Sequence, residues 1–289
     1  MGKILLIVNP VAGGKDKQSI VRLAGEILGK PDVVYTTHAG HATALARETD
    51  AEVVVAVGGD GTVSEVARGL AGSSKALGIV PCGSGDGLAL HLGLSRNPRR
   101  ALETIRRCDI EPMDYGEVNG QPFFTTTGVG FDAQVGYDFA KAETRGLLTY
   151  VRVAVRDWFS YGEDEYDVTV DGQHWHGRAL MITVGNANQW GNNAKICGPA
   201  SVRDGKFFVT VVKPVGSLRL LSLIPTLITG HVDKCSSAVC LEGGAVDIKR
   251  SGEAPMHIDG EPLIAGKEIA ARIHPAGLKV IIGKKKELI

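Results

Sequence analysis

The segment at residues 53–65, VVVAVGGDGTVSE, constrains the possible folds of this chain more than any other stretch. An apolar run of mostly β-branched residues passes directly into Gly58 and Gly59, and an amphipathic pattern resumes near Val63. A buried strand that turns through glycines into a helix has this pattern. Glycine also lets a ligand approach the backbone closely. Asp60 is therefore placed to meet a metal ion, a ribose or a reacting hydroxyl; the alternative is a tight turn with a surface aspartate.

The same unit recurs along the first half of the chain. Short apolar runs end in polar or glycine-rich loops, and segments with helical spacing follow them. This alternation predicts an α/β domain with a mostly parallel sheet, which binds ligands beyond the carboxyl ends of its strands. The other expected strands cover residues 3–8, 33–35 and 76–80, and the expected helices reach residues 28, 49, 71 and 92. Neither a Walker A loop nor the dinucleotide fingerprint is present.

Two basic side chains stand in these loops. Lys15 closes a Gly-rich loop before a predicted helix, where backbone N–H groups favour phosphate, and its charge could add to that preference. A plain turn is the alternative. His41 follows the second strand, where a lone histidine is more often a surface or capping residue than a catalyst.

The second half has a different pattern. Asp-Gly pairs at 171–172, 204–205 and 259–260 separate short apolar runs, which is typical of turns between antiparallel strands. We expect a glycine-punctuated loop at 128–133, a helix at 140–159, and a β-sandwich or distorted barrel with strands at 166–170, 175–184, 207–212, 245–249, 268–273 and 278–282. The predicted domains are residues 1–115 and 116–289, with the last strand free to return to the first domain.

Composition excludes some classes of protein. The 289 residues carry 32 basic and 32 acidic side chains, which argues against a nucleic-acid binder driven by bulk charge. Five cysteines without metal-ligand spacing favour reduced thiols in a cytoplasm. The apolar segment 218–229 is too short to cross a bilayer; we interpret it as a packed helix, with an acyl-covering or membrane-touching segment as the alternative. The basic run 284–286 is either solvated or attracted to an anionic membrane.

Seven motifs in fixed order give the chain a family resemblance. They are NPVAGGK at 9–15, TTHAGHA at 36–42, GGDGTVSE at 58–65, GSGDGLA at 83–89, GVGFDA at 128–133, a segment ending in Asp204 and Gly205, and HIDGEP at 257–262. The series resembles the diacylglycerol kinase catalytic-domain superfamily, which includes soluble bacterial lipid kinases and sphingosine kinases. The resemblance implies an N-terminal α/β domain similar to NAD kinase and phosphofructokinase, followed by a C-terminal antiparallel β-sandwich that carries the lipid-facing cleft.

The resemblance also implies an activity. The family transfers the γ-phosphoryl group of ATP, with Mg²⁺, to a primary hydroxyl of a lipid, and diacylglycerol and a long-chain sphingoid base are the two acceptors to consider. We expect a cytoplasmic protein that meets its substrate peripherally at a membrane surface, and a homodimer stays open. The alternatives are an NAD kinase-like phosphotransferase, because NAD kinases share GGDGT, and an inactive nucleotide-binding regulator.

The matching motifs imply roles for individual residues. The nucleotide contacts would be Asn9, Thr36, Gly58, Gly59, Asp60, Gly61, Thr62, Val63, Ser64, Glu65 and Ser84. Glu261 would accept the proton, with Asp259 and Asp60 as rivals, and Asp60 is also the candidate to coordinate the nucleotide's Mg²⁺. A structural magnesium would use Asp204 together with carbonyl groups of Ser201 and Lys206.

The chain departs from the family pattern at two points. Many bacterial diacylglycerol kinases have Asn-Asp where this chain has Asp86 and Gly87, so the second acid is displaced by one position. The form GSGDGLA is closer to the GSGNALA of sphingosine kinases, which slightly favours a sphingoid base. Arg203 replaces an acid beside Asp204, and a cation there argues against the structural magnesium.

Overall fold

The computed structural model describes residues 2–144, 147–216 and 225–283 of the chain. The first part of the apolar segment, residues 218–224, and the basic run 284–286 lie outside the described residues. No helix in the described part of the chain is long and apolar enough to cross a membrane.

The first half forms a parallel sheet in the order β2-β1-β3-β4. Its strands are β1 (Ile4–Val8), β2 (Asp32–Tyr35), β3 (Val53–Gly58) and β4 (Ala76–Pro81). Its helices are α1 (Lys17–Leu28), α2 (His41–Glu48), α3 (Asp60–Leu70), α4 (Gly87–His91) and α5 (Pro98–Arg107). The predicted α/β domain is confirmed.

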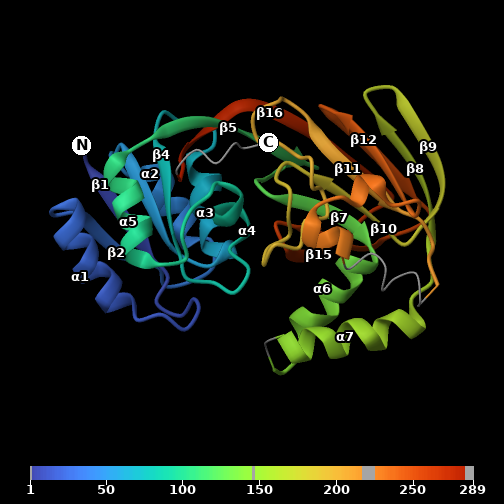
Figure 1. Ribbon diagram of the computed structural model, residues 1–289, viewed down its shortest axis with the longest axis horizontal. Helices are drawn as coiled ribbons and strands as arrows, with labels where there is room; N and C mark the ends of the chain where they lie inside the picture. Colours follow the sequence, from blue (N-terminus) through green and yellow to red (C-terminus); the bar gives the residue numbers. More distant parts are fainter. Residues whose placement is uncertain (1, 145–146, 217–224, 284–289) are drawn as a thin grey trace.

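Both faces of this sheet are covered by helices (Figure 1). Along β3, Val54 and Ala56 belong to a core shared with α2 and α3. Val55 and Val57 point to the opposite core, where Leu102 and other residues of α1 and α5 cover them. A strand that is apolar at every position is therefore buried on both sides, as expected for a parallel sheet.

The second half is the predicted antiparallel sandwich. One layer has the order β12-β11-β10-β7-β14-β15, and β16, β13, β8 and β9 face it. Ile182 and Val209 from the first layer share a core with Val168 and Ile248 from the second. The strands are β7 (Thr126–Gly130), β8 (Asp164–Val170), β9 (Gln173–Ala179), β10 (Met181–Gly185), β11 (Phe207–Val212), β12 (Ala238–Gly243), β13 (Ala245–Arg250), β14 (Ala254–Ile258), β15 (Glu261–Ala265) and β16 (Glu268–Ile281).

A single long strand joins the two halves. β16 pairs with β13 at one end, and at Lys279 and Val280 it pairs in parallel with β4 of the first sheet. It also pairs with β5 (Ile110–Val118), which in turn pairs with β6 (Gln121–Phe123). Two separate strands were expected over 268–282; a register shift between His274 and Leu278 lets one strand continue through them. One sheet therefore runs through both halves (Figure 1).

Other expectations for the second half need correction. Residues 128–133 are not a loop, because β7 passes directly through Gly130, with φ 103°, into α6 (Phe131–Lys141). The helix expected at 140–159 corresponds mainly to α7 (Leu147–Ser160), because residues 140 and 141 are the end of α6. The strand expected at 175–184 is divided into β9 and β10. A 3₁₀ turn, η1 (Val232–Lys234), precedes β12.

Candidate active site

Loops at the carboxyl ends of the parallel strands meet at one place. Asn9, which follows β1, donates a hydrogen bond from Nδ2 to Thr62 Oγ1 at 3.0 Å, and the Thr36 N–H donates to the Val8 carbonyl at 2.9 Å. A cavity of about 310 Å³ opens beside them, and its lining includes Asn9, Thr36, Thr62 and Glu65. Four of the residues implied as nucleotide contacts therefore share one cavity.

Glycines let these loops pack backbone against backbone. Gly13 has φ +63°, and a β-carbon there would collide with the Cys82 carbonyl of the fourth loop. A β-carbon on Gly59 would lie 3.3 Å from Gly83 Cα. No side chain caps α3, which begins directly after Gly59. The first turn of a helix presents N–H groups without intrahelical partners, so this end of α3 suits phosphate oxygens.

Asp60 fixes the fourth loop. Its carboxylate accepts the N–H of Asp86 at 2.8 Å and that of Gly87 at 2.7 Å. Burial raises the pKa of Asp60, and these backbone N–H groups oppose the shift. Each carboxylate oxygen keeps further lone-pair capacity. Asp60 therefore positions the loop at Asp86 and Gly87, a role that the sequence did not predict. Its contact with a nucleotide-bound metal stays a prediction.

Asp86 closes its own loop. It is buried in a left-handed conformation with φ 50°, and its Oδ1 accepts the N–H of Gly83 at 2.9 Å. Its Oδ2 lies 3.1 Å from Arg96 Nε without the geometry of a hydrogen bond. Burial, together with the nearby Asp60 charge, raises the pKa of Asp86. The displaced acid of the fourth motif is therefore held between Gly83 and Arg96.

Lys15 and Ser84 do not line the cavity beside Asn9 and Thr36. The Lys15 ammonium donates to the carbonyls of Pro81 and Arg96 at 2.7 and 2.6 Å, so it ties the first loop to the fourth. Ser84 is exposed, and its carbonyl accepts a hydrogen bond from Arg96 Nη2 at 2.9 Å. The structure thus gives Lys15 a structural contact between two loops, and its phosphate contact stays a prediction.

The motif at residues 36–42 contacts α3, the helix that follows β3. The Glu65 carboxylate of α3 accepts the Ala42 N–H at 3.1 Å, in the first turn of α2. His41 Nδ1 accepts the Thr37 N–H at 3.2 Å in the loop before α2, and no side chain caps the start of that helix. Glu65 therefore supports the second loop as well as lining the cavity.

Asp259 connects the sandwich to α3. It lies in the turn between β14 and β15 with φ 50°, and its carboxylate accepts four groups. Ser64 Oγ donates at 2.8 Å, the Phe124 N–H at 3.0 Å, and Thr125 through both N–H and Oγ1 at 2.7 Å. These four donors occupy acceptor positions that a substrate hydroxyl would otherwise approach. Asp259 is therefore better suited to hold the two halves together than to collect a proton.

Glu261 lies two residues further along the chain, and its carboxylate has fewer hydrogen-bond partners than that of Asp259. Its side chain is 50% exposed, and Arg68 Nη2 of α3 lies 3.3 Å from its Oε2. Its Oε1 would be 3.5 Å from a β-carbon on Gly61, so the carboxylate lies over the first turn of α3. Of these two acids, Glu261 is the more accessible to a ligand.

Two residues of α3 have contacts that the motifs did not predict: Arg68 was not singled out at all, and Ser64 was expected only as a nucleotide contact. Ser64 is buried and holds Asp259, and Arg68 holds Glu261. They are four residues apart on α3, so they share one face of the helix. That spacing was visible in the sequence, but nothing local indicated that the partners lie almost 200 residues further along.

The residues implied for a structural magnesium lie around the loop before β11. Asp204 Oδ1 accepts the Lys206 N–H at 3.0 Å, and burial, with Asp114 and Glu242 nearby, raises the pKa of Asp204. A cation would relieve that accumulation of negative charge. Arg203 pairs with Glu111 at 3.5 Å, so its charge is directed to another acid.

These residues fit a cation held by one carboxylate and backbone carbonyls, which is a ligand set that Mg²⁺ accepts. No group of three or more His, Cys, Asp or Glu side chains that could hold a metal ion occurs in the part of the chain that the structure describes. The structural magnesium stays a prediction.

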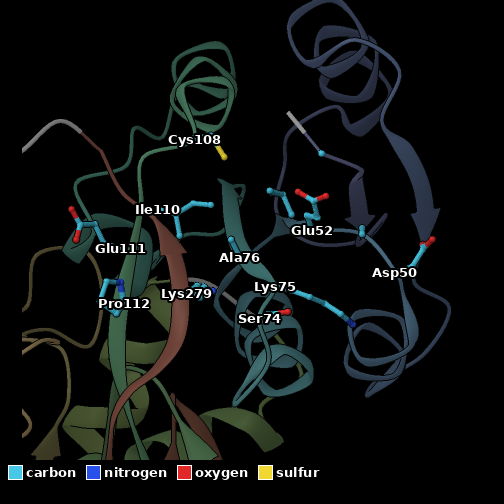
Figure 2. A pocket seen from close by; sticks show the side chains of 13 residues that line it. Asp50, Glu52, Ser74, Lys75, Ala76, Cys108, Ile110, Glu111, Pro112 and Lys279 are labelled. Atoms are coloured by element: carbon cyan, nitrogen blue, oxygen red, sulfur yellow. The ribbon is translucent and has the colours of Figure 1, made fainter.

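A second cavity, of about 580 Å³, lies at the other end of the parallel sheet (Figure 2). Val53 and Ala76, the first residues of β3 and β4, line it together with Cys108 and Lys279. None of the residues implied by the motifs lines it. The carboxyl ends of the strands therefore remain the candidate active site.

Comparisons with known proteins agree with this fold. Residues 3–118 match the model of the diacylglycerol kinase catalytic domain, and residues 125–282 match that of the YegS C-terminal NAD kinase beta sandwich-like domain. The chain therefore belongs to the diacylglycerol kinase and YegS-like lipid kinase family.

Individual relatives are distant in sequence. A diacylglycerol kinase of Bacillus subtilis (strain 168) is 28% identical over 234 residues, covering 78% of this chain and 77% of the relative. A protein of Klebsiella pneumoniae (strain 342) named "Probable lipid kinase YegS-like" is 28% identical over 241 residues, covering 81% and 79%.

Solved structures support the fold. The crystal structure of a diacylglycerol kinase from Bacillus anthracis str. Sterne has a TM-score of 0.75 at 22% identity, covering 98% of this chain and 97% of the other. An NAD kinase from Archaeoglobus fulgidus, solved in complex with ATP, has a TM-score of 0.57 at 13% identity, covering 98% and 94%. The predicted likeness of the first domain to NAD kinase is confirmed at the level of fold.

Proposed function

We propose that this chain is an ATP-dependent lipid kinase that transfers the γ-phosphoryl group to a primary hydroxyl of diacylglycerol or of a long-chain sphingoid base. The observation that carries the proposal is the position of the Glu261 carboxylate over the first turn of α3, where Gly61 leaves room for it. A phosphate-binding helix end and an accessible base then share one space. Family membership supports the general class of lipid kinase.

Phosphoryl transfer depends mainly on positioning and charge neutralisation. The acceptor hydroxyl oxygen attacks the γ-phosphorus, its proton passes to Glu261, and the bond from the γ-phosphorus to the β–γ bridging oxygen breaks to release ADP. A positioned base of this kind contributes about 10²- to 10⁴-fold. Arg68 orients Glu261 through its 3.3 Å contact.

The proposed nucleotide site uses the first domain. Asn9, Thr36, Thr62 and Glu65 line the cavity in which the nucleotide would lie. The uncapped start of α3 would face its phosphates. When bound, Mg²⁺ would neutralise charge on the phosphate oxygens, and Asp60 is the carboxylate at this end of the sheet that would hold it. The ATP-bound NAD kinase of similar fold supports the use of ATP.

Radiolabelled ATP tests this proposal directly. Purified protein is incubated with γ-labelled ATP, Mg²⁺, and diacylglycerol, sphingosine or NAD in separate reactions, and the products are separated by chromatography. We expect label in diacylglycerol or sphingosine, and its loss in Glu261→Gln. Label in NAD alone would support the NAD kinase alternative, and label in no acceptor would support a nucleotide-binding regulator.

The same proposal includes contact with a membrane, because both candidate acceptors reside in bilayers. We infer that the protein works peripherally on a membrane surface in the cytoplasm. The family resemblance alone does not say which surface of the molecule would make that contact.

A further inference from the structure

The outer face of α7 is an uncovered apolar stripe. Leu148, Val151, Val155 and Phe159 are 84, 47, 54 and 82% exposed, which makes them four of the most exposed large apolar side chains in the described part of the chain. Their spacing of three and four residues places them in a line on one side of the helix. α7 lies at the outside of the second half, and α6 is its neighbour (Figure 1).

The inner face of the same helix is firmly packed. Val153 is buried, and the Trp158 ring meets Phe131 of α6 edge to face at 5.6 Å. Tyr150 meets Phe139 of α6 in a similar arrangement at 5.5 Å. The helix is therefore held in place by contacts on its inner face. The apolar stripe on its outer face is exposed even though the helix itself is packed against α6.

The charges beside the stripe are positive. Arg152 and Arg156 are exposed between the apolar positions, and Asp157, the single acid of α7, is buried with Arg156 Nη2 2.6 Å from its Oδ1. Arg156 also reaches Asp138 at 3.2 Å, so Arg152 carries the less neutralised charge. An apolar line flanked by exposed arginines is the pattern of a helix that lies in the interface of an anionic membrane.

We propose that the outer face of α7 docks the protein on a bilayer surface that contains anionic lipids. Phe159 and Leu148 enter the boundary between headgroups and acyl chains, and Arg152 meets lipid phosphates. The helix axis then lies parallel to the membrane plane, since the stripe runs along its whole described length.

A second copy of the chain fits this face less well. A two-fold contact through the stripe would bring the arginines of both copies together, because the same patch meets itself. Four side chains also form a small surface beside the roughly 20–30 residues that each partner contributes to a stable interface. The charge pattern therefore favours a membrane over a second protomer.

Vesicle sedimentation tests the proposal without relying on catalysis. The full chain is mixed, without ATP, with vesicles of phosphatidylcholine or of phosphatidylcholine with phosphatidylglycerol, neither of which contains diacylglycerol or sphingosine. The double variant Leu148→Ser/Phe159→Ser is compared with Ile110→Ser, which changes an apolar residue exposed to 42% at the far end of the first sheet. Arg152→Gln is compared with Lys249→Gln, an exposed lysine on β13.

We expect the unaltered chain and Ile110→Ser to bind the anionic vesicles, and the double variant to bind at least about tenfold more weakly. Arg152→Gln weakens binding to anionic vesicles more than Lys249→Gln does. Thermal unfolding confirms that every variant is folded. Equal binding by the double variant, or no vesicle binding by the unaltered chain, overturns the proposal. A dimer that the double variant converts to monomer, without vesicle binding, assigns the stripe to a second copy and also overturns it.

The docking surface rests on the proposed function only through the expectation that the substrate resides in a bilayer. If the chain phosphorylates no lipid, the vesicle measurement still stands on its own. If both proposals hold, the double variant has a raised KM for long-chain lipid in vesicles and an unchanged kcat for a dispersed short-chain analogue.

Discussion

Replacing each acid of the Asp-Gly-Glu turn separately tests whether one acid builds the site and the other reacts in it. Asp259→Asn keeps the size of the side chain but turns one acceptor into a donor. That amide would face N–H and O–H groups which now donate to Asp259 from Ser64, Phe124 and Thr125. Hydrogen bonds to a charged group contribute about 1.5–3 kcal/mol each, and their neutral replacements less. We expect Asp259→Asn to lower the free energy of unfolding by about 2–4 kcal/mol.

Glu261→Gln is the matched variant. Its carboxylate is half exposed and has one ion pair, with Arg68. Because exposed pairs contribute about 0–1 kcal/mol, stability changes by about 0.5 kcal/mol or less. Loss of the base lowers kcat about 10²- to 10⁴-fold if Glu261 accepts the proton.

The assay combines thermal unfolding, followed by circular dichroism, with turnover of the lipid identified by radiolabelling. For a chain of this size about 1 kcal/mol corresponds to about 2 °C in Tm, so we expect a fall of about 4–8 °C for Asp259→Asn and about 1 °C or less for Glu261→Gln. A melting curve for Asp259→Asn that coincides with that of the unaltered chain would refute the structural role of Asp259. Near-full turnover by Glu261→Gln would remove Glu261 from the mechanism.

Three further predictions follow from other contacts. Gly13→Ala, which must displace the Cys82 carbonyl, raises KM for ATP at least about tenfold, whereas Gly14→Ala, with open space around its β-carbon, leaves it unchanged; steady-state kinetics with both variants decides. Burial lowers the pKa of His91 in the folded chain below its usual value of 6.5. As the pH falls below 6.5 the unfolded chain binds a proton that the folded chain does not, so the free energy of unfolding contributed by His91 is complete above pH 6.5 and falls by up to about 1.4 kcal/mol per pH unit below it. Urea unfolding of His91→Gln between pH 7.5 and 5.5 lacks this part of the slope. If Asp204 holds a structural magnesium, EDTA lowers the Tm of the unaltered chain and leaves that of Asp204→Asn unchanged, because a ligand that binds the folded state stabilises it; equal shifts in both would contradict the site.

The first half of the fold could be predicted because its signals are local. Each buried strand of the parallel sheet is a continuous apolar run, and a glycine-rich loop follows directly, as at Gly58 after β3. α5 was missed because its exposed side is densely charged, although Asn97 caps it and Pro98 occupies its first turn. Those two residues are a recognisable start signal for a helix.

The site was harder to predict because its contacts are not local. The motifs named Asp60 and Asp259 as reactive or metal-binding acids, but they did not indicate that Asp60 holds the N–H groups of Asp86 and Gly87. The donors to Asp259 stand more than 130 residues from it. A motif records that an acid is present; whether its oxygens are already occupied depends on segments that only folding brings together.

Asp259 and Glu261 both contact the same helix, α3. Ser64 and Arg68 of α3 hold Asp259 and Glu261, and the start of the same helix is the proposed phosphate site. The distance between this proposed phosphate site and Glu261, the proposed base, is therefore set by α3 and its contacts. Any closing motion between the halves that kept this geometry would have to leave the Ser64–Asp259 hydrogen bond intact. The parallel pairing of β16 with β4 joins the same two halves through a second contact, which does not involve α3.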